Sequence, residues 1–447
     1  MTMQTETVPE STIKSDGVVN VGLNASMAVT LKKMKEAQRA SGAPTYEQRI
    51  ASLDKLEKLV LKHKNAFAEA ISKDFGNRSK HETLIAEVFI VQSEIQHARD
   101  HLRDWMETET REVKWTFMPA RAEVIMQPLG VVGIISPWNY PVQLALAPLV
   151  GVIAAGNRAM IKPSEYVPAT AALLAKALGE SFSATEVAVV TGGPEVGEAF
   201  AKLPFDHLVF TGSTAVGKIV MRAASENLTP VTLELGGKSP AIVGDDFGIE
   251  EAAKRIMLGK LFNAGQTCIA PDYVLVPKGK VDAFVEACKT AATKMYPTFG
   301  DNADYTSIVN ARHYDRLKRV VSDAKEQGAK IVEINPGNED LAADKRKLLP
   351  TLVLNATDEM TVMQDEIFGP ILPVKSYATL AEAIDYVNDH PRPLALYFFG
   401  HDQAEIDRVL ETTTSGGVSI NETMLHCAQD ALPFGGVGAS GMGAYHG

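Results

Sequence analysis

The chain has 447 residues, of which 45% are hydrophobic, and a formal net charge of −11 at pH 7. A chain of this length exceeds what one hydrophobic core normally serves, so we expect at least two domains. The acidic balance argues against nucleic acid and anionic membrane surfaces as partners. The most apolar run, 142–155, contains Pro148 and Gly151 and is too short to span a bilayer. The three cysteines have no repeated spacing and the N-terminus lacks a secretory pattern, so we expect a cytoplasmic protein.

The N-terminal quarter predicts a tail, two helices and an excursion. Residues 1–21 are polar and are expected to form a loose tail. Residues 46–108 repeat apolar side chains at helical spacing, which predicts two long amphipathic helices separated at 77–79. Residues 113–128 are rich in β-forming residues and include two prolines, so we expect an extended excursion there.

The remaining chain alternates apolar runs with helical patterns, which is typical of parallel strands joined by crossover helices. The runs of the first series lie at 131–136, 159–162, 186–192, 206–212 and 231–235. A second series follows between 236 and 424. We therefore predict an α/β fold with a doubly wound first domain and a second α/β domain. The first is discontinuous, over 22–112 and 129–235, and the second covers 236–424, with 113–128 and 425–447 as bridging segments.

Two glycine-rich segments resemble phosphate-binding loops. The run GVGASG at 436–441 fits G-x-G-x-x-G, but it follows no buried strand, so a loop that contacts other parts of the chain is the better interpretation. GSTAVGK at 212–218 follows a strand and opens a helix, but Ile219 stands where a P-loop needs Ser or Thr to bind Mg²⁺. The start of that helix could still bind a phosphate group, or it could be an ordinary strand-to-helix turn.

Three residues are candidates for covalent chemistry. Cys268 lies on a glycine- and threonine-flanked turn, whereas Cys288 lies on a helix and is expected to be a core residue. Asn139 follows a strand and could stabilise a developing negative charge. Glu234 ends a strand, where α/β sheets place ligands, although a structural ion pair with Lys238 is the alternative.

A metal site is not expected. Glu94, His97 and His101 share one helical face, but no recognised metal-binding spacing is present, and a solvated helix face is the simpler explanation.

Seven motifs, in one order along the chain, resemble those of the aldehyde dehydrogenase superfamily. The segments PWNYP (137–141), RPLALYFFG (392–400) and GMGAYHG (441–447) most resemble its fatty and aromatic aldehyde branch. The resemblance extends from about residue 46 to residue 447. The motifs are PWNYP (137–141), IKPSE (161–165), FTGST (210–214), LELGGKSP (233–240), GQTCIAP (265–271), EIFGP (366–370) and PFGGVGASG (433–441).

This resemblance implies that an aldehyde is oxidised to a carboxylic acid through a thiohemiacetal and a thioester. Cys268 would be the nucleophile and Glu234 the general base, while Asn139 and the backbone N–H of Cys268 would bind the oxyanion. The resemblance also implies a homodimer, with the excursion and the C-terminal segment taking part in subunit pairing.

The resemblance implies NAD(P)+ as cofactor, bound by a Rossmann variant that lacks G-x-G-x-x-G. The acidic side chain of Glu165 favours NAD+, because it can bond to ribose hydroxyls and repel a 2′-phosphate, with NADP+ possible. The expected contacts are Trp138 beside the cofactor, Lys162 and Glu165 at the adenosine ribose, Gly212 and Ser213 at a phosphate, Glu366 at the nicotinamide ribose and Phe368 at its ring.

For the substrate we expect an aromatic aldehyde of the hydroxycinnamyl type, such as coniferyl aldehyde. The expected pocket is mostly apolar and is formed by Tyr140, Leu144, Thr267, Ile269 and Phe434. A relative that transfers the acyl group to coenzyme A would not need Glu234, and a phosphotransferase using 212–218 is disfavoured by Ile219. A non-catalytic descendant would be expected to have lost Cys268 or Glu234.

Overall fold

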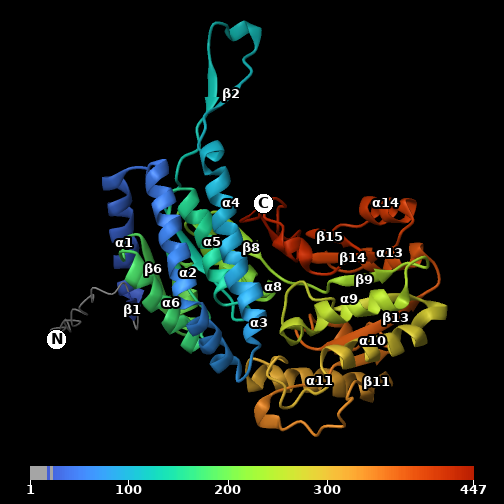
Figure 1. The fold of residues 1–447 in the computed structure, drawn as a ribbon. Coiled ribbons are helices and arrows are strands. Elements are labelled where there is room, and N and C mark those ends of the chain that lie inside the picture. Colours follow the sequence, from blue (N-terminus) through green and yellow to red (C-terminus); the bar gives the residue numbers. More distant parts are fainter. Residues whose placement is uncertain (1–17, 21–23, 447) are drawn as a thin grey trace, which may run out of the picture.

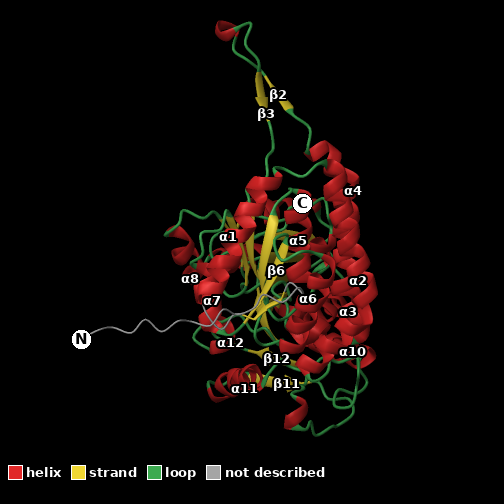
Figure 2. Ribbon diagram, turned by 90° about the vertical axis from the view of Figure 1, so that its left-hand side faces the viewer, coloured by secondary structure: helices red, strands yellow, loops and turns green. Residues whose placement is uncertain are grey.

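The structure is a computed structural model that describes residues 18–20 and 24–446. It contains two α/β units, each built around a seven-stranded sheet, and a hairpin that protrudes from the first unit (Figure 1). Helices cover the sheets, as the view in Figure 2 shows for the first unit. The predicted α/β class is confirmed, because both sheets are mostly parallel.

The first sheet has the order β1-β6-β5-β4-β7-β8-β16. Neighbours from β1 to β8 run parallel, whereas β16 is antiparallel to β8. The strand order reverses between β4 and β7, and this reversal is the place where doubly wound sheets bind ligands. The strands are β1 (Val18–Asn20), β4 (Val131–Ile135), β5 (Arg158–Lys162), β6 (Val187–Thr191), β7 (His207–Thr211), β8 (Val231–Glu234) and β16 (Gly441–Met442).

Both faces of this sheet are covered, which explains why its strands are continuous apolar runs. Val132 and Ile134 of β4 pack in the core with α2, α4 and α5, whereas Val131 packs in the core with α1 and α7. The helices of this unit are α1 (Asn24–Ser41), α2 (Tyr46–Phe75), α3 (Lys80–Thr83), the π-helix η1 (Leu84–Phe89), α4 (Ile90–Trp105), α5 (Gln143–Ala154), α6 (Pro168–Ser181), α7 (Pro194–Ala201) and α8 (Thr214–Ser225).

The second sheet has the order β11-β12-β13-β10-β9-β14-β15, with β11 as an antiparallel edge strand. Its strands are β9 (Pro240–Val243), β10 (Tyr273–Pro277), β11 (Lys330–Glu333), β12 (Thr351–Leu354), β13 (Ile371–Tyr377), β14 (Ala395–Phe399) and β15 (Gly417–Ile420). Its helices are α9 (Ile249–Leu261), η3 (Phe262–Gly265), η4 (Lys278–Lys280), α10 (Val281–Met295), α11 (Ala311–Glu326), η5 (Ala343–Lys345), α12 (Thr361–Gln364), α13 (Leu380–Asn388), α14 (Gln403–Thr412) and η6 (Leu425–Ala428).

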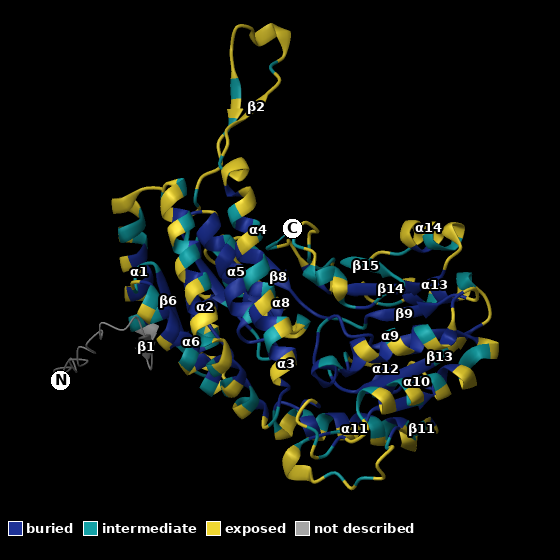
Figure 3. Cartoon of the chain, viewed as in Figure 1, coloured by how far each residue is buried: buried dark blue, intermediate teal, exposed yellow. Residues whose placement is uncertain are grey.

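The excursion between α4 and β4 is a hairpin. Strands β2 (Glu109–Arg111) and β3 (Ala122–Val124) pair antiparallel, and the short helix η2 (Trp115–Phe117) forms the tip. The tip stands clear of the body of the molecule (Figure 3) and exposes the side chains of Trp115, Phe117 and Met118.

One feature departs from the sequence analysis, and another agrees with it. Residues 18–20, expected within a loose tail, form β1 and pair parallel with β6, because two consecutive valines suit an edge strand. The other residues of that tail lie outside the described part of the chain. The loop at 436–441 leads into β16 and packs on β8, so the interpretation of this segment as a contact loop is confirmed and the dinucleotide fingerprint is excluded there.

Candidate active site

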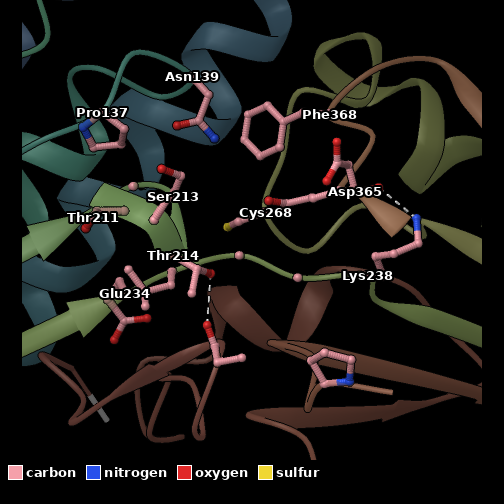
Figure 4. A pocket seen from close by; sticks show the side chains of 18 of the residues that line it. Pro137, Asn139, Thr211, Ser213, Thr214, Glu234, Lys238, Cys268, Asp365 and Phe368 are labelled. Carbon is pink, nitrogen blue, oxygen red and sulfur yellow. Dashed lines mark hydrogen bonds between the residues drawn. The ribbon is translucent and has the colours of Figure 1, made fainter. Parts of the chain in front are cut away.

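A cavity of about 740 Å³ lies where the two units meet. The segments that follow β4, β7 and β8 line one side of it, and residues of the second unit, including Cys268, Glu366 and Phe368, line the other. Figure 4 shows side chains from both units around the pocket, among them Asn139, Ser213, Cys268 and Phe368. The cavity therefore opens at the strand-order reversal of the first sheet, where the topology predicts a ligand.

Cys268 is presented by a tight turn that follows α9. Asn263 and Ala264 have left-handed backbone conformations, with φ of 50° and 51°. Gly265 has φ of 76°, and a Cβ there would lie 2.3 Å from a backbone oxygen of Gly369, so glycine is required. Buried Gln266 ties the turn down, because its amide donates to the backbone oxygen of Asn263 at 3.0 Å. The loop thus holds the sulfur at a fixed place in the cavity.

The surroundings of Cys268 favour the thiol form of its side chain. Burial raises the pKa of Cys268 well above its usual range, and the nearby carboxyl of Glu366 raises it further. A positive charge placed beside this sulfur would lower the pKa of the thiol and so increase the fraction of reactive thiolate. Cys288 lies fully buried in the core on α10, as expected from the sequence.

Asn139 lies in the segment after β4 and is 3% exposed. Its backbone oxygen accepts hydrogen bonds from Arg78 Nη1 at 2.8 Å and from Asn263 Nδ2 at 3.1 Å. Arg78 is itself buried and pairs with Glu87 at 2.8 Å. These contacts hold the backbone of Asn139, and its side chain lines the cavity with Cys268.

Glu234 ends β8 and is 3% exposed. Neither carboxyl oxygen has a hydrogen-bond partner among the described residues. The alternative ion pair with Lys238 does not form, because the ammonium of Lys238 bonds instead to Asp272 and to the backbone oxygen of Val362. Burial without a partner raises the pKa of Glu234 to about 9. An orphaned buried carboxyl of this kind is typical of a functional group rather than a structural one.

Aromatic rings form one wall of the cavity. The rings of Trp138 and Phe368 meet edge to face, with centroids 5.5 Å apart, and His313 lies 5.1 Å from Trp138. Phe368 has φ of 52°, an uncommon conformation for a large side chain. Arg316 donates to the backbone oxygen of Glu366 at 3.3 Å and thereby fixes the segment that carries Phe368.

Glu366 is the second acidic group of the cavity. Burial and the neighbouring Asp272 raise the pKa of Glu366 to about 8. One of its carboxyl oxygens has no hydrogen-bond partner among the described residues. A Cβ on Gly236 would lie 2.4 Å from this carboxyl, so the glycine leaves room for it. This free acceptor would suit a ribose hydroxyl.

The remaining cofactor candidates divide into two groups. Gly212 and Ser213 line the cavity, and Ser213 caps α8 by accepting from the backbone N–H of Val216 at 3.4 Å. Lys162 and Glu165 do not line this cavity. Lys162 ends β5 and Glu165 follows it, and the two form an ion pair of 2.8 Å.

A second cavity of about 280 Å³ adjoins the first on the other side of Cys268. Cys268 and Leu144 line both cavities, so the thiol lies between them. The five residues expected to form the substrate pocket all line this second cavity, and so do several apolar side chains that the sequence did not single out. The five are Tyr140, Leu144, Thr267, Ile269 and Phe434, and the additional apolar ones include Ile85, Ile90, Leu258, Phe262, Met424 and Leu425.

Several residues of the site had no signal in the sequence. Arg78 appeared only as part of the break between two helices, yet its guanidinium lies 4.8 Å from the Tyr140 ring and holds the Asn139 backbone. His313 and Arg316 belong to α11, whose pattern resembles that of any surface helix. Their places at the cavity depend on contacts with distant segments, of His313 with Trp138 and of Arg316 with Glu366, which a local pattern cannot reveal.

The chain matches the model of the aldehyde dehydrogenase family over residues 12–447. It is 54% identical over 436 residues to a probable coniferyl aldehyde dehydrogenase of Caulobacter vibrioides, covering 96% of this chain and 90% of that protein. It is 50% identical over 434 residues to the coniferyl aldehyde dehydrogenase of a Pseudomonas species, with the same coverage.

The fold of the chain also matches solved structures of aldehyde dehydrogenases. The substrate-bound AldH of Staphylococcus aureus is 40% identical and superposes with a TM-score of 0.89, covering 96% of this chain and 91% of that one. The indole-3-acetaldehyde dehydrogenase AldA of P. syringae, in complex with NAD+ and IAA, is 26% identical with a TM-score of 0.84, covering 94% of this chain and 85% of that one.

Proposed function

Because the chain belongs to the aldehyde dehydrogenase family, we propose that it oxidises an aromatic aldehyde to the carboxylic acid by covalent catalysis at Cys268. The observation that carries the proposal is the place of this thiol between two cavities of different chemistry. One is bordered by aromatic rings, acidic groups and a helix N-terminus, and the other is apolar. A nucleophile at their junction can face a cofactor on one side and an aldehyde on the other.

The residues of the larger cavity fit a nicotinamide dinucleotide. The helix N-terminus at Ser213 suits a phosphate, the free acceptor on Glu366 suits a ribose hydroxyl, and the rings of Trp138 and Phe368 suit a flat ring system. NAD(P)+, when bound, supplies the hydride acceptor and a positive charge that favours the thiolate of a nearby cysteine. In this assignment the first unit, 22–112 and 129–235, is the cofactor domain and 236–424 the catalytic domain.

In the acylation half of the reaction, the Cys268 thiolate adds to the aldehyde carbon. The side-chain amide of Asn139 and the backbone N–H of Cys268 then donate to the oxygen that becomes negative. One such positioned donor is typically worth about 2.7–4 kcal/mol in the transition state. The bonds from Arg78 and Asn263 to the Asn139 backbone keep that donor in place. A nicotinamide bound in the larger cavity would accept the hydride from the adduct carbon, which would leave a thioester on Cys268.

In the second half, Glu234 acts as the general base for hydrolysis. Its carboxylate removes a proton from water, the hydroxide adds to the thioester carbon, and the Cys268 thiolate leaves. Neither oxygen of this buried carboxyl has a hydrogen-bond partner among the described residues, which supports a role in the reaction over one in the fold. The second candidate reaction is transfer of the acyl group to coenzyme A. It would not need Glu234 as a general base, because no water has to be activated.

We assign an aromatic aldehyde of the hydroxycinnamyl type, such as coniferyl aldehyde, as the substrate. The second cavity is small and apolar, which suits a flat ring, and the two relatives described above bear this substrate in their names. An apolar pocket separates close analogues weakly, since one methylene is worth about 1–3 kcal/mol. The test is NADH formation, followed by absorbance, over a panel of aldehydes. Preference for aldehydes that bear a carboxylate would refute the assignment.

We assign NAD+ as the preferred cofactor, with NADP+ accepted. The carboxylate of Glu165 accepts from Lys162 at 2.8 Å, which holds an acidic group after β5, where it can bond to ribose hydroxyls and repel a 2′-phosphate.

We further infer a cytoplasmic homodimer. A tip with three large exposed apolar side chains is typical of a surface that pairs with a second subunit. All three cysteines are free thiols, as expected in a reducing compartment. No helix in the described residues is long and apolar enough to cross a membrane.

A further inference from the structure

Two cysteines border the second cavity. Cys268 and Cys427 both line it, and both are half-buried free thiols, whereas Cys288 is fully buried on α10 and lines neither cavity. Cys427 lies in η6, far along the chain from Cys268. The two also pack against the same core cluster, together with Met424 and Phe434. The fold therefore brings the proposed nucleophile and a second thiol to one cavity of about 280 Å³.

The side chain of Tyr397 holds both thiol-bearing segments. Tyr397 is buried on β14, and its hydroxyl donates to the backbone oxygen of Ile269, the residue after Cys268, at 2.5 Å. The backbone of Met424 hydrogen-bonds to the same hydroxyl. The backbone N–H of Cys427 in turn donates to the oxygen of Met424 at 3.2 Å. A single buried group thus fixes the turn that presents Cys268 and the turn that presents Cys427 against one another.

The electrostatics of the site agree with this arrangement. Burial raises the pKa of Cys268 well above its usual range, and the side chains of Glu366 and Cys427 raise it further. Burial also raises the pKa of Tyr397, and both Cys427 and Cys268 add to that increase. Because the effect of one charge on another weakens with distance, these shifts indicate that the two sulfur atoms lie close to the Tyr397 hydroxyl and to each other.

We propose that Cys268 and Cys427 form a redox pair, in which a peroxide oxidises Cys268 and Cys427 then closes a disulfide with it. The disulfide occupies the nucleophile and crosses the cavity that is assigned to the aldehyde, so the oxidised protein is inactive. This inference goes beyond the proposed function, because the disulfide can be measured whether or not the protein oxidises aldehydes.

The oxidation takes place in two steps. In the first, the Cys268 sulfur attacks one oxygen of hydrogen peroxide and the O–O bond breaks. The sulfur loses two electrons and becomes a sulfenic acid, while the peroxide is reduced to water. In the second, the Cys427 sulfur attacks that of Cys268, the S–O bond breaks, and the leaving hydroxide takes the Cys427 proton to form water.

The second thiol makes this oxidation reversible. A reducing dithiol opens the disulfide by thiol exchange and restores both thiols. A sulfenic acid without a neighbouring thiol is instead oxidised further to the sulfinic acid, which a dithiol does not reduce. Cys427 therefore protects Cys268 from permanent loss.

The experiment treats the full chain with an excess of hydrogen peroxide and then removes the peroxide with catalase. Mass and NADH formation are measured before and after reduction with dithiothreitol. The parent should lose the mass of two hydrogen atoms, and peptide mapping without reduction should find Cys268 joined to Cys427 within one chain. Aldehyde oxidation should fall about tenfold or more and should return to most of its starting value on reduction.

Two variants, each compared with its own activity before treatment, complete the test. Cys427→Ser lacks the second thiol, so peroxide should leave a sulfinic acid on Cys268, and reduction should restore less than about a tenth of the activity. Cys288→Ala removes the thiol that lies outside both cavities. This matched control should form the disulfide and recover as the parent does.

A parent that gains oxygen on Cys268 without a bond to Cys427 would overturn the inference, and so would recovery of Cys427→Ser equal to that of the parent. In both cases the proposed function would stand. If the parent formed the disulfide but oxidised no aldehyde before treatment, the proposed function would fall and the redox pair would remain.

Discussion

Replacing Glu234 by glutamine separates the two halves of the proposed reaction. The substitution keeps the size of a side chain that is 3% exposed, and it removes a carboxyl whose two oxygens have no partner among the described residues. Because no bond to the carboxyl is lost, we expect the fold and the cofactor cavity to be unchanged. Only the removal of a proton from water, and with it hydrolysis of the thioester, should become slower.

The magnitude follows from the pKa of Glu234, which burial raises from 4.5 to about 9. At pH 7 only about 1% of the carboxyl is ionised, and each added pH unit raises that fraction about tenfold until it levels off near pH 9. If hydrolysis of the thioester limits turnover, kcat of the parent should rise in the same way. Loss of a general base typically costs about 10²- to 10⁴-fold, and the variant should show no such rise with pH.

The assay is rapid mixing with NAD+ and an aromatic aldehyde. Acylation of Cys268 in Glu234→Gln should release a burst of NADH of up to about one per site, followed by a very slow steady rate. Mass spectrometry should find the acyl group on the Cys268 peptide. A variant without a burst and without an adduct, despite intact NAD+ binding, would move Glu234 to the acylation step. Near-parental turnover would remove it from the mechanism.

Unfolding of the same variant provides a second measurement. The folded protein holds the proton of Glu234 up to about pH 9, whereas the unfolded chain releases it near 4.5. Between these values the folded state binds more protons, so the carboxyl lowers stability as pH rises, by at most about 1.4 kcal/mol per pH unit. Glu234→Gln should therefore gain stability over the parent as the pH increases from 5 to 8. A stability difference that does not change with pH would show that the carboxyl is ionised or hydrated in the folded state.

Further predictions concern the nucleophile, the cofactor and the assembly. Cys268→Ala should abolish aldehyde oxidation while NAD+ binding, measured by calorimetry, persists, and Cys288→Ala should retain most turnover; near-parental oxidation by Cys268→Ala would refute covalent catalysis. Glu165→Gln should narrow the preference for NAD+ over NADP+ in kcat/KM, and a parent that strongly prefers NADP+ would contradict the assignment. Trp115 and Phe117 are 85% and 64% exposed at the hairpin tip, so changing both to Asp should convert a dimer into monomers in light scattering; an unchanged mass would place the interface elsewhere.

Local sequence was sufficient for the fold class, and it singled out the groups that we propose to react. Apolar runs such as 131–136 alternate with helical patterns because a parallel strand is buried on both faces and needs a crossover to return. The turn at Cys268 was visible because glycine and asparagine there break a helix, and the structure shows the left-handed backbone that they permit at Asn263 and Gly265. Family motifs then connected Cys268 with Glu234 and Asn139, which the structure places around one cavity.

Only the tertiary structure decided how those groups are supported. Glu234 could have paired with Lys238, four residues away, but the fold places that lysine against Asp272 and leaves the carboxyl alone in a buried site. Arg78 supports Asn139 across 61 residues. Burial, orphaned polar atoms and the separation of two cavities by one thiol depend on contacts between distant segments. A sequence pattern contains only the periodicity of its own segment, so these properties arise when the chain has folded.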